Sequence, residues 1–190
     1  MKTICVYCGS ASQASRNYFQ AASRMGETLA RMDLTLVYGG GKTGLMGALA
    51  DSVLEHGGQV IGVIVESMNT PELAHTRLTR LEVTATIHQR KARMYALADG
   101  YLALPGGYGT LDELFETLTL VQTRTIQPVP IILVGERYWR QAINIDFLVE
   151  EGSIDAEDRE LFWYAETAQE IWDGILQWHT VNGAPLFPPA

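Results

Sequence analysis

The chain has 190 residues, of which 47% are hydrophobic and 19% are charged. This composition excludes a disordered or collagen-like protein, and the length suits one compact domain. Its 22 acidic residues outnumber the 14 basic ones, which gives a formal net charge of −8. A negative charge argues against a general binder of nucleic acid or membrane surfaces, because both need basic fields. It still permits a small anionic ligand held by a few local cations.

The alternation of short apolar runs with helical patterns predicts the order of the elements. Strands are expected at residues 4–7, 34–38, 60–65, near 81–83, and at 101–104 and 129–134. Helices are expected at residues 17–32, 45–55, 86–98, 110–123, from about 138, and at 167–179. Thr167 and Glu170 have the spacing of a capping box at the start of the last helix.

This alternation predicts an α/β fold with a single Rossmann-like, doubly wound, mainly parallel sheet and helices on both faces. We expect one domain over residues 1–182 and a loose, Pro-rich tail over 183–190. Three expected strands end in small or glycine-rich segments, at 9–11, 39–44 and 105–110. Ligands bind beyond the carboxyl ends of strands in such sheets, so these segments should line one crevice. The substrate-binding candidates there include Gly9, Ser10, Gly40 and Gly41.

The cysteines and histidines predict no metal site. Cys5 and Cys8 have C-x-x-C spacing, but residues three apart on a strand point to opposite faces, so packing is expected rather than redox chemistry. The four histidines lack metal-ligand spacing. No apolar run reaches the roughly 18 residues of a membrane span, and the first residues lack a signal-peptide layout. With only two cysteines, this predicts a cytoplasmic protein.

The segment from Gly39 to Gly44 matches G-x-G-x-x-G between a strand and a helix, and Glu66 lies 22 residues further on. This formally satisfies the dinucleotide-binding fingerprint. It is not a Walker A loop, because Leu36 occupies the place of that motif's first glycine. Two interpretations stay open: amides facing an anion at the helix start, or a tight turn that needs glycine.

The segment Pro105–Thr110 is more specific, because its glycines permit close approach of a phosphate and a helix start follows. Glu113 stands at capping-box spacing from Thr110, so capping and catalysis are both open for its carboxylate. Arg90 falls within the apolar face of the preceding helix, where a charge needs a partner. It could form a structural salt bridge with Glu113 or Glu116, or clamp a phosphate or a catalytic carboxylate.

These motifs resemble the LONELY GUY (LOG) family of cytokinin-activating phosphoribohydrolases, long mislabelled as lysine decarboxylases. The resemblance rests on the pair Arg90-Lys91 and the pattern P-G-G-x-G-T-x-x-E from Pro105 to Glu113. It extends to CGSA (8–11), YGGGKTGLMG (38–47) and NIDFLVEEGSI (144–154), and so covers most of the chain.

The resemblance implies hydrolysis of the N-glycosidic bond of N6-substituted or plain adenosine 5′-monophosphates, without metal or cofactor. The products would be the free base, a cytokinin or adenine, and ribose 5-phosphate. By motif position, Arg90 and Glu113 would be the catalytic pair. The phosphate would be held by Gly106, Gly107, Gly109 and Thr110. Further substrate-binding positions would be Glu72, Lys91, Tyr108, Leu111, Asp112, Glu116 and Thr119.

The implied chemistry suits these two residues. Breaking the bond builds positive charge on the ribose, and the carboxylate of Glu113 can stabilise that charge or position the attacking water. Arg90 would lower the pKa of Glu113 and keep it ionised. The resemblance also implies a homodimer or a larger homo-oligomer, and Leu120, opposite the apolar stripe of its helix, could lie in such a contact.

Three other functions remain open from the residues. A nucleotide-binding sensor without hydrolytic activity would use the same loops. An NAD(P)-dependent oxidoreductase would use Gly39–Gly44 and Glu66, but it leaves Arg90 and the second glycine loop unexplained. A pyridoxal-phosphate decarboxylase would need Lys91 as its Schiff base.

Overall fold

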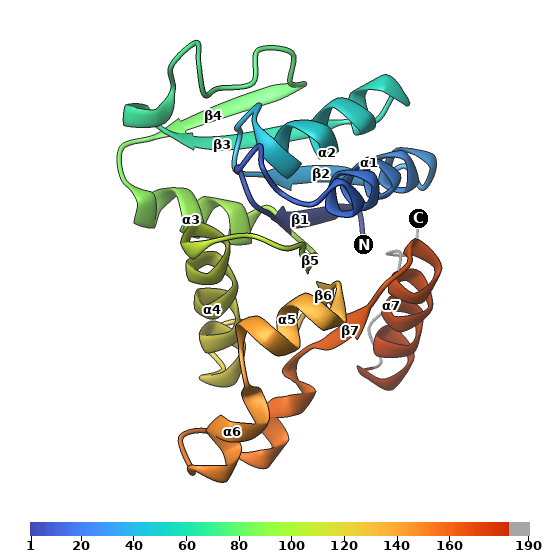
Figure 1. Ribbon diagram of the computed structural model, residues 1–190, viewed down its shortest axis with the longest axis vertical. Coiled ribbons are helices and arrows are strands. Elements are labelled where there is room, and N and C mark those ends of the chain that lie inside the picture. The colour runs from blue at the N-terminus through green and yellow to red at the C-terminus, as the bar shows by residue number, and fades with distance from the viewer. Residues whose placement is uncertain (183–190) are drawn as a thin grey trace.

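The seven strands of the described chain form one parallel sheet (Figure 1). The computed structural model describes residues 1–182, so the tail predicted at 183–190 lies outside the described residues. The strands are β1 (Thr3–Tyr7), β2 (Thr35–Tyr38), β3 (Val60–Val65), β4 (Arg80–Thr84), β5 (Gly100–Ala103), β6 (Ile131–Val134) and β7 (Trp163–Ala165). Their order is β4-β3-β2-β1-β5-β6-β7, and all six pairings are parallel.

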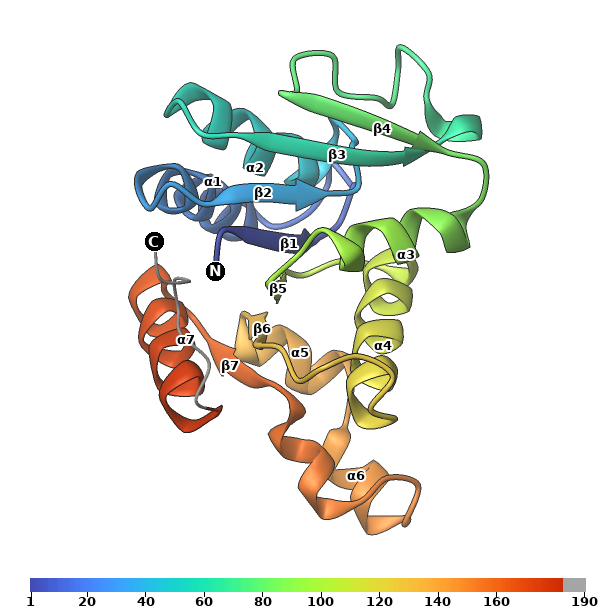
Figure 2. The ribbon, with the colours of Figure 1, turned by 180° about the vertical axis from the view of Figure 1, so that it is seen from behind.

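Helices cover both faces of this sheet, which confirms the predicted fold class. One face packs against α1 (Arg16–Arg31), α2 (Gly44–Glu55) and α7 (Ala168–Asn182). The other face packs against α3 (Ile87–Ala96), α4 (Tyr108–Gln122) and α5 (Glu136–Ala142). The short α6 (Ile145–Glu150) lies at the end of the molecule far from β4 (Figures 1 and 2).

The two-residue repeat of β1 divides the core into two clusters. Ile4 and Val6 pack under α1 and α2, whereas Cys5 and Tyr7 pack under α3 and α4. Cys8, three residues after Cys5, joins the first cluster, so the two free, buried cysteines lie on opposite faces of the sheet. This arrangement follows directly from the alternation of side chains along a strand.

The order of the strands reverses at β1, which pairs with β2 on one side and with β5 on the other. The chain moves outward from β1 to β4 and then returns to β5. A crevice opens beyond the carboxyl ends of strands at such a reversal, because the connections on its two sides cover opposite faces. The segments that follow β1, β2 and β5 meet here.

Several boundaries differ from the sequence expectation. The strand expected at 129–134 begins at Ile131; the preceding Pro130 has no N–H to donate, although its carbonyl oxygen accepts from the amide of Tyr101 at 2.9 Å. The strand β7, the helix α6 and the 3-10 helices Glu66–Met68 and Ala156–Leu161 were not expected. At the start of α7, the hydroxyl of Thr167 accepts from the amide of Glu170 at 3.2 Å, as the capping spacing predicted. Among residues 1–182, no helix combines the length and apolar character needed to cross a bilayer.

Candidate active site

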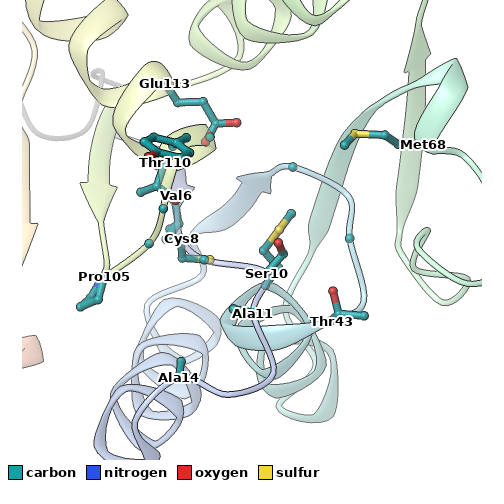
Figure 3. Close-up of a pocket in the computed structure, with 18 of the residues that line it drawn as sticks. Val6, Cys8, Ser10, Ala11, Ala14, Thr43, Met68, Pro105, Thr110 and Glu113 are labelled. Carbon is teal, nitrogen blue, oxygen red and sulfur yellow. The ribbon is translucent and has the colours of Figure 1, made fainter.

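A cavity of about 570 Å³ opens at the carboxyl ends of the central strands, and all three predicted loops line it (Figure 3). Residues from β1, β2 and β5 therefore meet in one place although they lie almost 100 positions apart. Ten of the predicted site residues line the cavity: Gly9, Ser10, Gly41, Arg90, Gly106, Gly107, Tyr108, Gly109, Thr110 and Glu113.

Arg90 and Glu113 form a buried ion pair at the wall of this cavity. Nη1 of Arg90 donates to Oε1 of Glu113 at 2.8 Å, and Nε donates to the carbonyl oxygen of Val63 at 2.8 Å. The side chains of Arg90 and Glu113 are only 11% and 8% exposed. The guanidinium is fixed because its two acceptors lie on different elements, β3 and α4. It in turn orients the carboxylate of Glu113.

Burial, not the neighbouring cation, determines the pKa of Glu113. Removal from water raises the pKa of this carboxyl above its usual value, and the charge and hydrogen bond of Arg90 lower it by less. We expected Arg90 to lower this pKa; its contribution has that sign, but the net shift is upward. Glu113 therefore takes up a proton at a higher pH than an ordinary glutamate, and it can accept a proton more readily during a reaction.

The loop after β5 leads directly into α4 and turns the start of that helix towards the cavity. Gly107 is the N-cap of α4, so of the two roles left open for Glu113 the structure excludes a capping box with Thr110. Thr110 is instead the third residue of the helix, and Glu113 lies one turn further on with its side chain on Arg90. The first amides of a helix have no acceptor within it, so they are available to an anion.

Thr110 and Gly106 pack so closely that only glycine fits at position 106. A Cβ atom there would collide with Oγ1 of Thr110, which is itself 3% exposed. The amide of Gly9 donates to the carbonyl oxygen of Pro105 at 3.1 Å and ties the loop after β1 to the loop after β5. The two loops therefore form one wall of the cavity.

The G-x-G-x-x-G segment serves largely as a tight turn. Gly44 has a φ of +61°, and a Cβ there would collide with the backbone of Ser10. The amide of Leu45, at the start of α2, donates to the carbonyl of Gly9 at 3.0 Å and is thus occupied within the protein. Glu66 is exposed and does not line the cavity. This geometry favours the structural interpretation over the dinucleotide fingerprint.

Lys91 points away from the cavity and joins α3 to α4. Its Nζ lies 2.8 Å from Oδ1 of Asp112 and 2.5 Å from Oε2 of Glu116. Burial alone would lower the pKa of Lys91, but the hydrogen bonds to these two carboxylates raise it overall. A lysine held as an ammonium in this way is unsuited to form a Schiff base. Lys91, Asp112 and Glu116 therefore have a structural position in this chain.

Four other predicted substrate-binding residues also do not line the cavity: Gly40, Glu72, Leu111 and Thr119. Gly40 faces β3 and has a φ of +76°. The hydroxyl of Thr119 donates back to the carbonyl of Phe115 within α4, at 2.7 Å. Glu72 is exposed, and hydrogen bonds from its own amide and from Thr70 lower its pKa.

Two side chains of the segment 66–79 line the cavity on the side opposite the carboxylate of Glu113. Met68 lies across the cavity from Glu113 (Figure 3), and Leu73 lines it too. The segment is held by backbone bonds from Lys42 to Leu73 and from His75 to Gly40, each 2.9 Å long. His75 is buried, and its Nε2 lies 3.1 Å from Oδ1 of Asp51 on α2. This wall therefore presents apolar side chains to the cavity, and polar groups attach it to the rest of the protein.

Two residues at the cavity have roles that the sequence did not reveal. Gly39 lies against the guanidinium of Arg90, and a Cβ at this position would collide with Nη2. Tyr138, on α5, lines the cavity and donates a hydrogen bond to the carbonyl oxygen of Gly106 at 2.5 Å. The triple-glycine run was a signal for Gly39, whereas nothing near Tyr138 in sequence pointed to the loop 32 residues earlier.

Within residues 1–182, no group of three or more His, Cys, Asp or Glu side chains could hold a metal ion. The charged side chains that line the cavity are those of Arg90 and Glu113, and the backbone amides of the glycine loop lie at the same cavity. Together they can stabilise a developing cation, hold a water molecule and bind an anion.

Comparisons with known proteins agree with this geometry. Residues 46–175 match the family model described as "Possible lysine decarboxylase". The cytokinin riboside 5′-monophosphate phosphoribohydrolase of Rhodococcoides fascians is 42% identical over 160 residues, covering 83% of this chain and 81% of that protein. The enzyme of the same name LOG3, from Arabidopsis thaliana, is 40% identical over 171 residues, covering 90% and 80%. The probable enzyme LOGL3 of Oryza sativa subsp. japonica is 39% identical, covering 93% and 84%.

Solved structures with lower identity share the fold. The Moco carrier protein of Chlamydomonas reinhardtii superposes with a TM-score of 0.70 at 21% identity, covering 95% of this chain and 98% of that one. The molybdenum cofactor binding protein of Rippkaea orientalis gives a TM-score of 0.67 at 19% identity, with 95% and 98% coverage. At these identities, the similarity concerns the arrangement of helices and strands alone.

Proposed function

Because the chain belongs to the LONELY GUY family, we propose that it hydrolyses the N-glycosidic bond of adenosine 5′-monophosphates, including N6-substituted forms, to a free base and ribose 5-phosphate. The observation that carries this proposal is the pair Arg90–Glu113 at 2.8 Å, which lines the same cavity as the glycine loop at the start of α4. One end of that cavity suits a phosphate, and the pair suits the sugar.

The 5′-phosphate binds the glycine loop in this mechanism. Its oxygens accept hydrogen bonds from the amides of Gly107, Tyr108 and Gly109, and the helix dipole of α4 favours the negative charge. The phosphate is remote from the bond that breaks, so its binding energy serves to hold the ribose in a reactive position.

The bond between C1′ and the base nitrogen breaks as a water molecule attacks C1′. The bonding electrons leave with the base, which takes up a proton, and positive charge develops on the ribose ring. The carboxylate of Glu113 stabilises this charge and accepts a proton from the attacking water. Arg90 holds the carboxylate in position and favours its ionised form, against the effect of burial.

The base lies towards the apolar side of the cavity, where Met68, Leu73 and Ile87 are 48%, 43% and 40% exposed. An alkyl group on N6 of adenine would cover these side chains, and each buried methylene contributes about 0.8 kcal/mol. This supports N6-alkylated nucleotides as substrates of the same site.

The test is a product assay with a panel of nucleotides: AMP, N6-isopentenyl-AMP and adenosine. We expect release of base and ribose 5-phosphate from the monophosphates, little turnover of adenosine, and no effect of a chelator. Glu113→Gln should lower kcat about 10²–10⁴-fold, because the loss of a proton acceptor has effects of this size. The amide oxygen of glutamine can still accept from Arg90, so the melting temperature should stay close to that of the wild type.

Two results would refute the proposal: binding of AMP without any release of base, as in a sensor, or equal turnover of AMP and adenosine. A Glu113→Gln protein that keeps its kcat and melts at a lower temperature would assign this carboxylate to the fold alone.

We also infer that the chain forms a homodimer or a larger homo-oligomer. Tyr108, at the cavity rim, is 93% exposed, and Phe115 is 39% exposed and lies seven residues later on the same helix, so both aromatic side chains stand on one face of α4 that a second copy could cover. Light scattering coupled to size-exclusion chromatography tests this.

We infer a reducing, cytoplasmic location, with which the free state of both cysteines agrees; fractionation of the source cells would test this.

A further inference from the structure

Tyr138 stands outside every motif of the site, yet its hydroxyl reaches the glycine loop. The hydroxyl donates to the carbonyl oxygen of Gly106 at 2.5 Å. A tyrosine hydroxyl has one proton, so the group that donates to Gly106 cannot also donate to a ligand. Through this proton, the hydroxyl can act on a bound molecule only by way of the loop backbone and not by direct donation.

That bond fixes the orientation of the peptide between Gly106 and Gly107. The described chain contains no cis peptide bond, so the C=O of Gly106 and the N–H of Gly107 point in opposite directions. With the oxygen held by Tyr138, the N–H faces away from the tyrosine. No protein acceptor meets this N–H among the described residues, so it is left available to a ligand.

The preceding peptide is fixed in the same way. The carbonyl oxygen of Pro105 accepts from the amide of Gly9 at 3.1 Å, which turns the N–H of Gly106 away from that loop. Two successive peptides thus have their oxygens occupied by donors from elsewhere in the fold. The residues on either side of the second peptide, Gly106 and Gly107, are glycines, whose backbone rotates easily, so without these donors a carbonyl oxygen could turn towards the anion site and repel a phosphate.

The ring of Tyr138 is itself firmly placed. It meets Trp139 edge-on at a centroid distance of 5.2 Å and Tyr18 at 6.0 Å. Trp139 is fully buried, and its Nε1 donates to the carbonyl oxygens of Ala103 and Val134 at 3.1 Å each. These bonds attach α5 to the ends of β5 and β6, next to the loop that Tyr138 holds.

We propose that Tyr138 is a positioning residue for the phosphate: its hydroxyl presets the Gly106–Gly107 peptide so that the amide of Gly107 faces the anion. This inference rests on the proposed function, because it concerns the same phosphate end of the cavity. It adds a residue from α5 to a site otherwise built from α3, α4 and the strand ends.

The experiment compares Tyr138→Phe with the wild type by calorimetric titration of ribose 5-phosphate and of adenosine. Phenylalanine keeps the ring contacts and removes only the hydroxyl. We expect the affinity for ribose 5-phosphate to fall about tenfold, the loss typical of one hydrogen bond to a charged group, and the affinity for adenosine to stay unchanged. In turnover, KM for AMP should rise with little change in kcat at saturation.

Tyr101→Phe is the matched control. Its hydroxyl donates to the carbonyl of Tyr95 at 3.0 Å, outside the cavity, so its loss should lower the melting temperature without changing either affinity. Unchanged binding of ribose 5-phosphate by Tyr138→Phe would overturn the proposal, and so would equal losses for ribose 5-phosphate and adenosine. If the wild type releases no base, the proposed function fails, but the titrations still decide the role of Tyr138. If Tyr138→Phe does not fold, Tyr138→Leu provides a second apolar side chain without a donor for the carbonyl of Gly106.

Discussion

Replacing Gly39 by alanine tests the placement of the Arg90 guanidinium in the proposed mechanism. A Cβ at position 39 would collide with Nη2 of Arg90 and lie 2.6 Å from Cε of Met46, whereas ordinary contacts begin near 3.4 Å. The methionine can rotate away. The guanidinium cannot move freely, because Val63 and Glu113 hold it by hydrogen bonds of 2.8 Å.

The size of the effect follows from this geometry. The guanidinium must shift by about 1 Å, which breaks at least one of its two bonds, and a displacement of this size in an active site costs about 10²-fold in rate. The loss of one buried hydrogen bond to a charged group costs about 1.5–3 kcal/mol of stability. For a chain of this length each kcal/mol lowers the melting temperature by about 2–4 °C.

Two assays separate these effects. Release of adenine from AMP gives kcat/KM, and calorimetry gives the melting temperature. The double variant Gly39→Ala/Met46→Ala is the control, because it removes the collision with methionine and keeps the collision with Arg90. Recovery of kcat/KM in the double variant would refute the reasoning, as would a Gly39→Ala enzyme with the activity of the wild type.

Two further variants test the charges around the pair. Asp112 raises the pKa of Glu113, so Asp112→Asn should lower this pKa. The mechanism needs the ionised carboxylate, so the acid limb of kcat/KM against pH should move to lower pH. A shift to higher pH, or no shift, would contradict this. Lys91→Met should lower the melting temperature by a few degrees while KM for AMP stays within about twofold, because Lys91 joins α3 to α4 outside the cavity. A large rise in KM would instead place Lys91 on the substrate.

The interior of the fold was predictable because its strands are apolar and bounded by glycine or proline. The strand β7 was not, since its three residues, Trp163 to Ala165, are too few to show an alternation and two of them are only half-buried. The helix α6 has six residues and buries none of them, so its apolar side chains form no periodic pattern long enough to detect. Elements such as β7 and α6 form because of the elements that they pack against, and a local sequence pattern carries no information about those distant neighbours.

The residues of the site likewise include some that the sequence predicted and some that it could not predict. The pairing of Arg90 with a carboxylate followed from a charge on an apolar helix face, and the place of the loop after β5 at the cavity followed from its glycines. Lys91, Asp112 and Glu116 were predicted at the substrate but pair with one another outside the cavity, because a motif gives proximity along the chain and not the direction of a side chain on its helix. Tyr138 could not be found, since its contact depends on how α5 packs against the loop after β5.

Under the proposed function, the attachment of residues 66–79 would keep the choice of base separate from the reacting groups. This strip is joined to its neighbours by main-chain bonds and by His75 and Asp51, none of which touches Arg90 or Glu113. Side chains such as Met68 and Leu73 can therefore be exchanged while the reactive groups stay in register. One scaffold could in this way be retargeted, by evolution or by design, from one purine to another through a short stretch of sequence.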